Sequence, residues 1–116
     1  MSTNGLDHVY IETHDYDATR EFWRALGYTI GFETGHGSGR LDPPTAGPYL
    51  FINQVGVDEQ PQVMLYLDVD DSDLFDPPDG VTLGTGWEHT HWGTRTAELT
   101  DPDGRTVVLE DQRRDA

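Results

Sequence analysis

The side chains that could act as acids, bases or metal ligands in this sequence are 22 aspartates and glutamates and five histidines. There is no cysteine, so thiol catalysis and disulfide bonds are excluded. No serine has a histidine and an acid arranged around it in a pattern that suggests a nucleophile. His8, Glu98 and Glu110 are the candidate catalytic residues, with either carboxylate as a general base against the histidine. His8 and Glu110 could also bind a divalent cation together.

A histidine pair, His89 and His91, is a second metal candidate. Side chains two positions apart on a strand share a face and could hold one ion. The neighbouring residues Trp87, Glu88 and Trp92 are more typical of a loop. We therefore expect a ligand-contacting or exposed loop here rather than a metal site.

The whole-chain composition limits the classes of partner. A net charge of −15 argues against nucleic acid, which needs a basic surface, and permits a cationic ligand. No apolar run approaches the roughly 18 residues of a membrane span, and residues 1–5 lack the features of a signal peptide. We expect a cytoplasmic protein without a membrane partner. The glycine-rich stretch 34–39 lacks the lysine of a phosphate loop, so we expect a mobile turn or lid.

Alternating and helical patterns indicate the elements that position these side chains. A helix is expected after Asp15 or Asp17, with an apolar stripe facing the sheet and an end at Gly27. The stripe consists of Ala18, Phe22, Ala25 and Leu26. A tight turn at 101–104 predicts a hairpin. The predicted strands are 6–13, 28–33, 49–55, 63–69, 95–100 and 105–109, with a further short one at 81–83.

The sequence also repeats itself. Residues 9–12 match 65–68, and the pattern within 47–52 returns within 104–109. We therefore predict a single domain over 1–116. It would contain two copies of one module, the first at about 5–55 and the second at about 62–112. The helix of the second copy would be shortened.

If one face of each module is aliphatic, the other face remains to be explained. It could be the solvated side of a sheet. Its aromatic side chains favour a concave pocket for a small molecule instead. The residues predicted on this face are His8, Tyr10, Glu12, Tyr49, Phe51, Asn53, Met64, Tyr66, Asp68, Glu98, Val108 and Glu110.

Three stretches resemble the vicinal-oxygen-chelate superfamily, which includes glyoxalase I, extradiol dioxygenases and bleomycin-resistance proteins. They are residues 6–9 (LDHV), 20–28 (REFWRALGY) and 92–104, which begins WGTR and ends DPDG. The resemblance implies an α+β fold, in which paired βαβββ modules form an eight-stranded half-barrel around a cavity. It also implies a homodimer. Fold alone does not fix activity.

The resemblance also implies where a metal would bind. Its four ligand positions correspond to His8, Phe51, Met64 and Val108, and only His8 supplies the oxygen or nitrogen donor that Zn, Mn, Ni or Fe(II) needs. We therefore expect no cofactor, and we lean against an enzyme. The chain looks most similar to the metal-free, bleomycin-resistance-like branch.

The expected function is metal-independent binding of a small molecule by a homodimer, which could sequester an antibiotic. The ligand would be cationic and aromatic, stacking on aromatic rings and neutralised by Glu12, Asp68, Glu98 or Glu110. The predicted ligand-binding residues are Tyr10, Glu12, Tyr49, Phe51, Met64, Tyr66, Trp92, Val108 and Glu110. One alternative is a metal-dependent lyase, isomerase or dioxygenase that uses His8 with Glu110 on a substrate with vicinal oxygens. A cofactor-free enzyme is a third reading.

Overall fold

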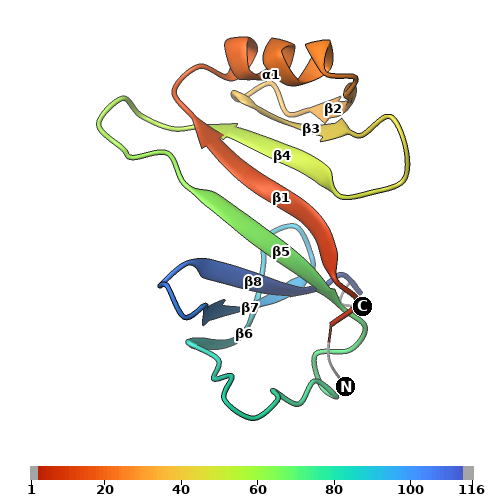
Figure 1. Ribbon diagram of the computed structural model, residues 1–116, viewed down its shortest axis with the longest axis vertical. Helices are drawn as coiled ribbons and strands as arrows, with labels where there is room; N and C mark the ends of the chain where they lie inside the picture. The colour runs from red at the N-terminus through yellow and green to blue at the C-terminus, as the bar shows by residue number, and fades with distance from the viewer. Residues whose placement is uncertain (1–2, 114–116) are drawn as a thin grey trace. The chain divides into compact units, whose positions relative to one another are not determined.

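The computed structural model describes residues 3–113, which form an α+β fold of eight strands and one helix (Figure 1). The chain divides into two compact units, one formed by 8–63 and the other by the residues before His8 together with those after Val63. The strand β1 (Leu6–Thr13) crosses the boundary between them. Among the described residues no helix has the length and apolar character needed to cross a membrane.

The first module contains β1, α1 (Tyr16–Ala25), β2 (Thr29–Glu33), β3 (Ser38–Asp42) and β4 (Tyr49–Gln54). Its strands lie in the order β2-β3-β4-β1, with β1 parallel to β4 and the other pairs antiparallel. The second module contains β5 (Val63–Val69), β6 (Thr85–His89), β7 (Arg95–Thr100) and β8 (Thr106–Asp111). Its order is β5-β8-β7-β6, and β5 is parallel to β8. The same pairing pattern therefore occurs twice.

The core of the first module lies between its sheet and α1. Leu50 and Ile52 of β4 and Leu41 of β3 are buried there, and Val9 and Ile11 of β1 pack against them. The alternation along β1 and β4 predicted these inward residues. The opposite side of each strand is consequently left to the polar and aromatic residues.

Asp15 caps the helix as predicted, but the side of the helix that packs on the sheet is not the predicted one. The Ala18 N–H donates to Asp15 Oδ1 at 3.1 Å, and Gly27 follows the helix with φ of 107°. The expected apolar stripe faces outward, however, with Phe22 61% exposed and Leu26 also exposed. The residues that face the sheet are instead Tyr16 and Trp23.

The anchoring of Tyr16 explains this orientation of α1. Its backbone N–H donates to Gln54 Oε1 at 2.9 Å, and its hydroxyl donates to Glu33 Oε2 at 2.7 Å. Tyr16 is therefore fixed at both ends against β4 and β2. Trp23, seven positions later, lies on the same side of the helix and joins the core.

Two loop predictions are wrong in part. The stretch 34–39 is a hydrogen-bonded turn between β2 and β3, closed by Thr34 N–H to the Ser38 carbonyl at 3.0 Å, and β3 already begins at Ser38. The short strand predicted at 81–83 lies instead at Thr85–His89. Trp87, Glu88 and His89 are thus on strand β6 rather than in a loop, while His91 and Trp92 lie in the turn that follows.

The predicted shortening of the second helix is confirmed, because within the described residues no helix connects β5 to β6. A turn at 71–74 replaces it. The Ser72 N–H of this turn donates to Asp111 Oδ2 of β8 at 2.8 Å. A buried carboxylate therefore holds the segment where the first module has a helix.

A candidate ligand-binding face in the first module

The side of the first module's sheet away from α1 carries the predicted set of aromatic and polar side chains. We call this set, with two further residues, the aromatic face. It consists of His8, Tyr10, Glu12, Phe32, Arg40, Tyr49, Phe51 and Asn53, all within the unit 8–63. Five of the nine predicted ligand-binding residues lie in the other module and are described below.

A row of side chains crosses all four strands of this face. The register pairs Phe32 with Arg40, Arg40 with Phe51, and Phe51 with Tyr10. The rings of Tyr10 and Phe51 are nearly parallel, with centroids 6.5 Å apart. The ring centroids of Phe32 and Phe51 are 6.2 Å apart, and Phe32 is 50% exposed. The row therefore offers apolar ring surface on which a flat molecule could stack.

A second group of rings lies beside this row. His8 and Tyr49 are paired across β1 and β4, and their rings stack at 4.5 Å with planes 9° apart. The Arg40 guanidinium carbon lies 3.8 Å from the Tyr49 ring centroid. Arg40 Nε also donates to Asp42 Oδ1 at 2.7 Å. These contacts hold a cation flat against an aromatic ring at this face.

On β1 and the neighbouring β4, three polar side chains of the face are joined by hydrogen bonds. Tyr10 Oη donates to Glu12 Oε2 at 2.9 Å and accepts from Asn53 Nδ2 at 3.0 Å. The other oxygen of Glu12 accepts the Gln62 N–H at 3.0 Å. Burial raises the pKa of Tyr10, so the phenol remains protonated at neutral pH. The polar group therefore fixes the Tyr10 ring rather than activating it as a base.

In the second module, the two candidate carboxylates, Glu98 and Glu110, are on neighbouring strands but are not directly opposite each other. Glu98 lies opposite Val108, which itself pairs with Tyr66, whereas Glu110 lies opposite Asp68 and Thr96. Val108 is buried and Glu98 is exposed. Met64, a further predicted contact, is half-buried on β5.

Glu110 is the buried acid of this module, with only 4% of its surface exposed. Its Oε2 accepts hydrogen bonds from Trp92 Nε1 at 3.0 Å and from Thr94 Oγ1 at 2.9 Å. Trp92 and Glu110 were both predicted to contact the ligand, and this hydrogen bond shows that they lie side by side. The indole orients the carboxylate while its ring remains partly open to solvent.

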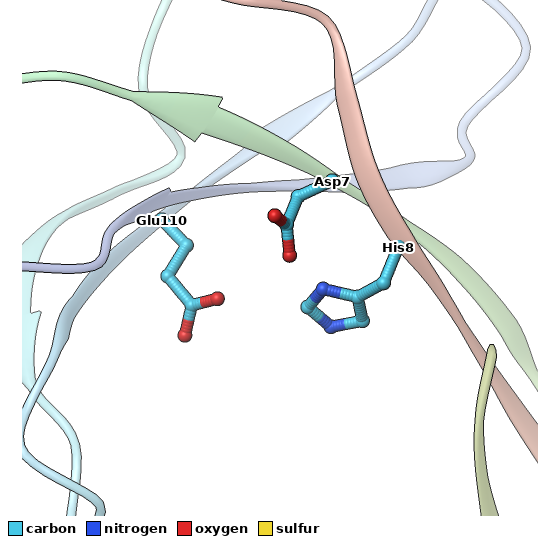
Figure 2. A group of neighbouring side chains, drawn as sticks. All are labelled: Asp7, His8 and Glu110. Carbon is cyan, nitrogen blue, oxygen red and sulfur yellow. The ribbon is translucent and has the colours of Figure 1, made fainter. Parts of the chain in front are cut away.

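Asp7, which the sequence did not single out, lies beside Glu110 in the same unit. Their carboxylate oxygens approach within 4.8 Å (Figure 2). His8, also drawn there, is the next residue of β1 and begins the other unit. Two carboxylates are suitable oxygen ligands for a hard divalent cation. By contrast, the four positions implied by the family resemblance do not fit a metal, because Phe51, Met64 and Val108 carry no suitable donor atom.

The remaining metal candidates are not brought into a cluster. His89 and His91 are both exposed, and among the described residues neither belongs to a group of three potential ligands. The His91 ring instead packs edge-on against Trp92, with centroids 4.8 Å apart.

Comparison with known proteins gives the fold but no close relative. No protein-family model and no curated protein matches the sequence. A glyoxalase/bleomycin resistance protein/dioxygenase superfamily member from Vibrio splendidus has a similar structure, with a TM-score of 0.62. The alignment covers 89% of this chain and 95% of that one at 14% identity. The chain therefore has the fold of that superfamily, as the sequence motifs predicted.

Two enzymes share this fold over part of their length. The Mn(II)-bound glyoxalase from Novosphingobium aromaticivorans matches 99% of this chain with a TM-score of 0.67 and 16% identity. A halotolerant catechol dioxygenase matches 94% with a TM-score of 0.63 and 13% identity. This chain spans only 41% and 39% of the lengths of these two proteins. At such identities the likeness concerns the fold alone.

Proposed function

We propose that this protein is a metal-independent binding protein for a small aromatic molecule. The observation that carries the proposal is the cross-strand row of Phe32, Arg40, Phe51 and Tyr10. Rings such as Phe32 are unfavourable in open solvent, and a stacked ligand would remove their surface from water. Sequestration of an aromatic antibiotic is the specific form of this activity that we propose.

Binding is favoured over catalysis by the chemistry of the side chains on this face. Tyr10 has a raised pKa, and both oxygens of Glu12 accept hydrogen bonds within the protein. The Tyr10 phenol is therefore no base at neutral pH, and both oxygens of Glu12 are engaged within the protein. Their arrangement is suited to holding a ring in a fixed position.

We also propose that the protein acts as a homodimer. The outward stripe of α1, which includes Phe22 and Leu26, is an apolar surface that a second copy could cover. Sedimentation equilibrium measures this directly, and a monomer at micromolar concentration would remove the dimer from the proposal. A cytoplasmic location and the lack of a nucleic-acid partner stay predictions from composition.

The binding experiment compares Phe51→Ala with Phe75→Ala. Both substitutions remove a phenyl ring, but only Phe51 is on the aromatic face, whereas Phe75 packs on Trp87 in the other module. Aromatic antibiotics are screened by thermal shift, and affinities of the hits are measured by calorimetry. Loss of the Phe51 ring should weaken binding by about 2 kcal/mol, which is roughly thirtyfold. Phe75→Ala should leave it within about twofold. Equal effects of the two substitutions would place the binding site elsewhere.

The competing possibility is a metal-dependent activity at the Asp7 and Glu110 carboxylates. The same titrations are therefore repeated after chelator treatment and after incubation with Mn²⁺. Metal-independent binding predicts unchanged affinity in both cases. Binding that is lost on chelation, regained with Mn²⁺ and absent from Glu110→Gln would overturn the proposal.

A further inference from the structure

Arg40 occupies a central position on the aromatic face. It lies on β3, with Phe32 on one neighbouring strand and Phe51 on the other. Its side chain reaches along the face to Tyr49, which is two residues from Phe51 on β4, so a flat molecule that extends from the rings toward Tyr49 meets the guanidinium group. Arg40 therefore has a direct influence on which ligands the face accepts.

The guanidinium group is held in one orientation before a ligand arrives. One of its flat sides is covered by Tyr49, and Nε is bound to Asp42. The side chain is still 40% exposed, and neither the Tyr49 nor the Asp42 contact uses its terminal amino groups. The terminal amino groups form the planar fork that matches a carboxylate or a phosphate.

The strand next to Arg40 is shaped to accommodate this arrangement. β2 has an irregularity in its register between Ile30 and Phe32, at Gly31. A Cβ atom at Gly31 would lie 2.8 Å from Asp42 Oδ2 and 3.2 Å from Arg40 Cγ. The absence of a side chain there gives the Arg40–Asp42 pair its space.

The other charges of the face are placed differently. Glu12 lies on β1, two strands from Arg40, which corresponds to about 10 Å. Phe51 of β4 lies on the strand between them, and Glu12 already accepts two hydrogen bonds. The net charge of −15 attracts cations at long range, but salt screens this attraction beyond about 8 Å at physiological ionic strength. Asp42 offsets part of the Arg40 charge, but its hydrogen bond is to Nε, so the terminal amino groups of Arg40 remain charged donors on this face.

We propose that the aromatic face selects flat aromatic molecules that carry an anionic group, such as aromatic carboxylates. The ring of the ligand lies on Phe32 and Phe51, and its carboxylate accepts hydrogen bonds from the terminal amino groups of Arg40. This inference rests on the proposed binding function and adds the ligand class. It runs opposite to the cationic ligand that the overall composition favours.

The test uses three probes with one ring system and different charges: 2-naphthoate, 2-naphthylmethanol and 2-naphthylmethylammonium. Affinities for the full-length protein are measured by calorimetry in about 0.3 M salt, where long-range attraction is screened. We expect naphthoate to bind at least about tenfold more tightly than the ammonium probe. The preference should nearly disappear in Arg40→Gln. Arg40→Lys should keep part of it, because lysine retains the charge but loses the planar fork.

Arg105→Gln is the matched control, since it removes one exposed arginine from the 101–105 turn of the other module. It should leave the preference unchanged. Circular dichroism and melting temperature establish that each variant is folded. Tighter binding of the ammonium probe, or a preference that survives Arg40→Gln, would overturn the inference while the binding function stands. Failure of all three probes and of the antibiotic panel to bind would instead overturn the proposed function.

Discussion

Asp111→Asn tests how the second module holds together without a helix. The carboxylate is 1% exposed and accepts hydrogen bonds from Ser72 N–H at 2.8 Å and from Arg113 Nε at 3.1 Å. The Arg113 backbone N–H donates to it as well, at 3.0 Å. Burial disfavours the charged form, but these hydrogen bonds outweigh it and hold the pKa of Asp111 well below its usual range.

The asparagine variant should lose about 2–3 kcal/mol of unfolding free energy at pH 7. A hydrogen bond to a buried charged group contributes about 1.5–3 kcal/mol. In asparagine one carboxylate oxygen is replaced by an NH₂ group, which would face an N–H donor and cannot accept a hydrogen bond from it. The Arg113 contribution is discounted, since that side chain is 54% exposed to solvent. The loss of the Ser72 hydrogen bond is therefore the main term.

The pH dependence has a definite sign. Because the folded pKa of Asp111 is below the unfolded value of about 3.9, its stabilisation is complete well above that value and is lost as the pH falls through the folded pKa. The difference between wild type and Asp111→Asn should therefore be constant from about pH 6 to 8 and shrink below about pH 4. Urea unfolding followed by tryptophan fluorescence measures it, and exchange of the Ser72 amide proton reports the local effect.

Asp103→Asn provides the control, because that carboxylate is exposed in the 101–104 turn. It should change stability by less than about 0.5 kcal/mol. The reasoning is refuted if Asp111→Asn is equally harmless at neutral pH, or if its effect is the same at pH 3.5 as at pH 7.

Two further predictions concern the packing of α1. Gly39→Ala should cost about 1–3 kcal/mol in urea unfolding, because the new Cβ would collide with the Tyr16 hydroxyl and lie 2.9 Å from the Phe32 carbonyl oxygen. Unchanged stability would mean that α1 is not seated on β3 as described. Phe22→Ser should change the stability of the monomer by less than about 0.5 kcal/mol, whereas Trp23→Ala should cost about 2–3 kcal/mol, measured by thermal unfolding of each. A larger loss of stability for Phe22→Ser than for Trp23→Ala would mean that the apolar stripe, and not Trp23, faces the sheet.

Strands β1 and β4 could be predicted because one face of the sheet is aliphatic and the other is not. Alternation along β1 separates Val9 and Ile11 from Tyr10, and the structure places the aliphatic pair against the core. A shift of one residue would exchange the two faces, so burial of one face fixes the register strongly. The same alternation assigns the aromatic side chains of these strands to the opposite face, so the sequence alone predicts that they form one group.

The orientation of α1 could not be predicted, because two stripes compete on the same helix. The stripe of Phe22 and Leu26 is the more apolar, while that of Tyr16 and Trp23 is aromatic. Hydrogen bonds from Tyr16 to Gln54 and Glu33 decide between them. Both partners lie far from Tyr16 in sequence, and a periodicity argument does not include such contacts.

Arg40 was missed for a related reason, and it is the residue on which ligand selection depends. The glycine-rich stretch 34–39 was interpreted as a mobile turn or lid, and the alternation argument named no strand between residues 33 and 49, so the five residues of β3 were not recognised as a strand. Without β3 there is no cross-strand neighbour between Phe32 and Phe51. The sequence then shows aromatic rings and scattered carboxylates, which favour a cationic ligand. Pairing β3 with β2 and β4 places Arg40 on the same face as the two rings, with its guanidinium group against Tyr49, and this single addition reverses the charge expected of the ligand.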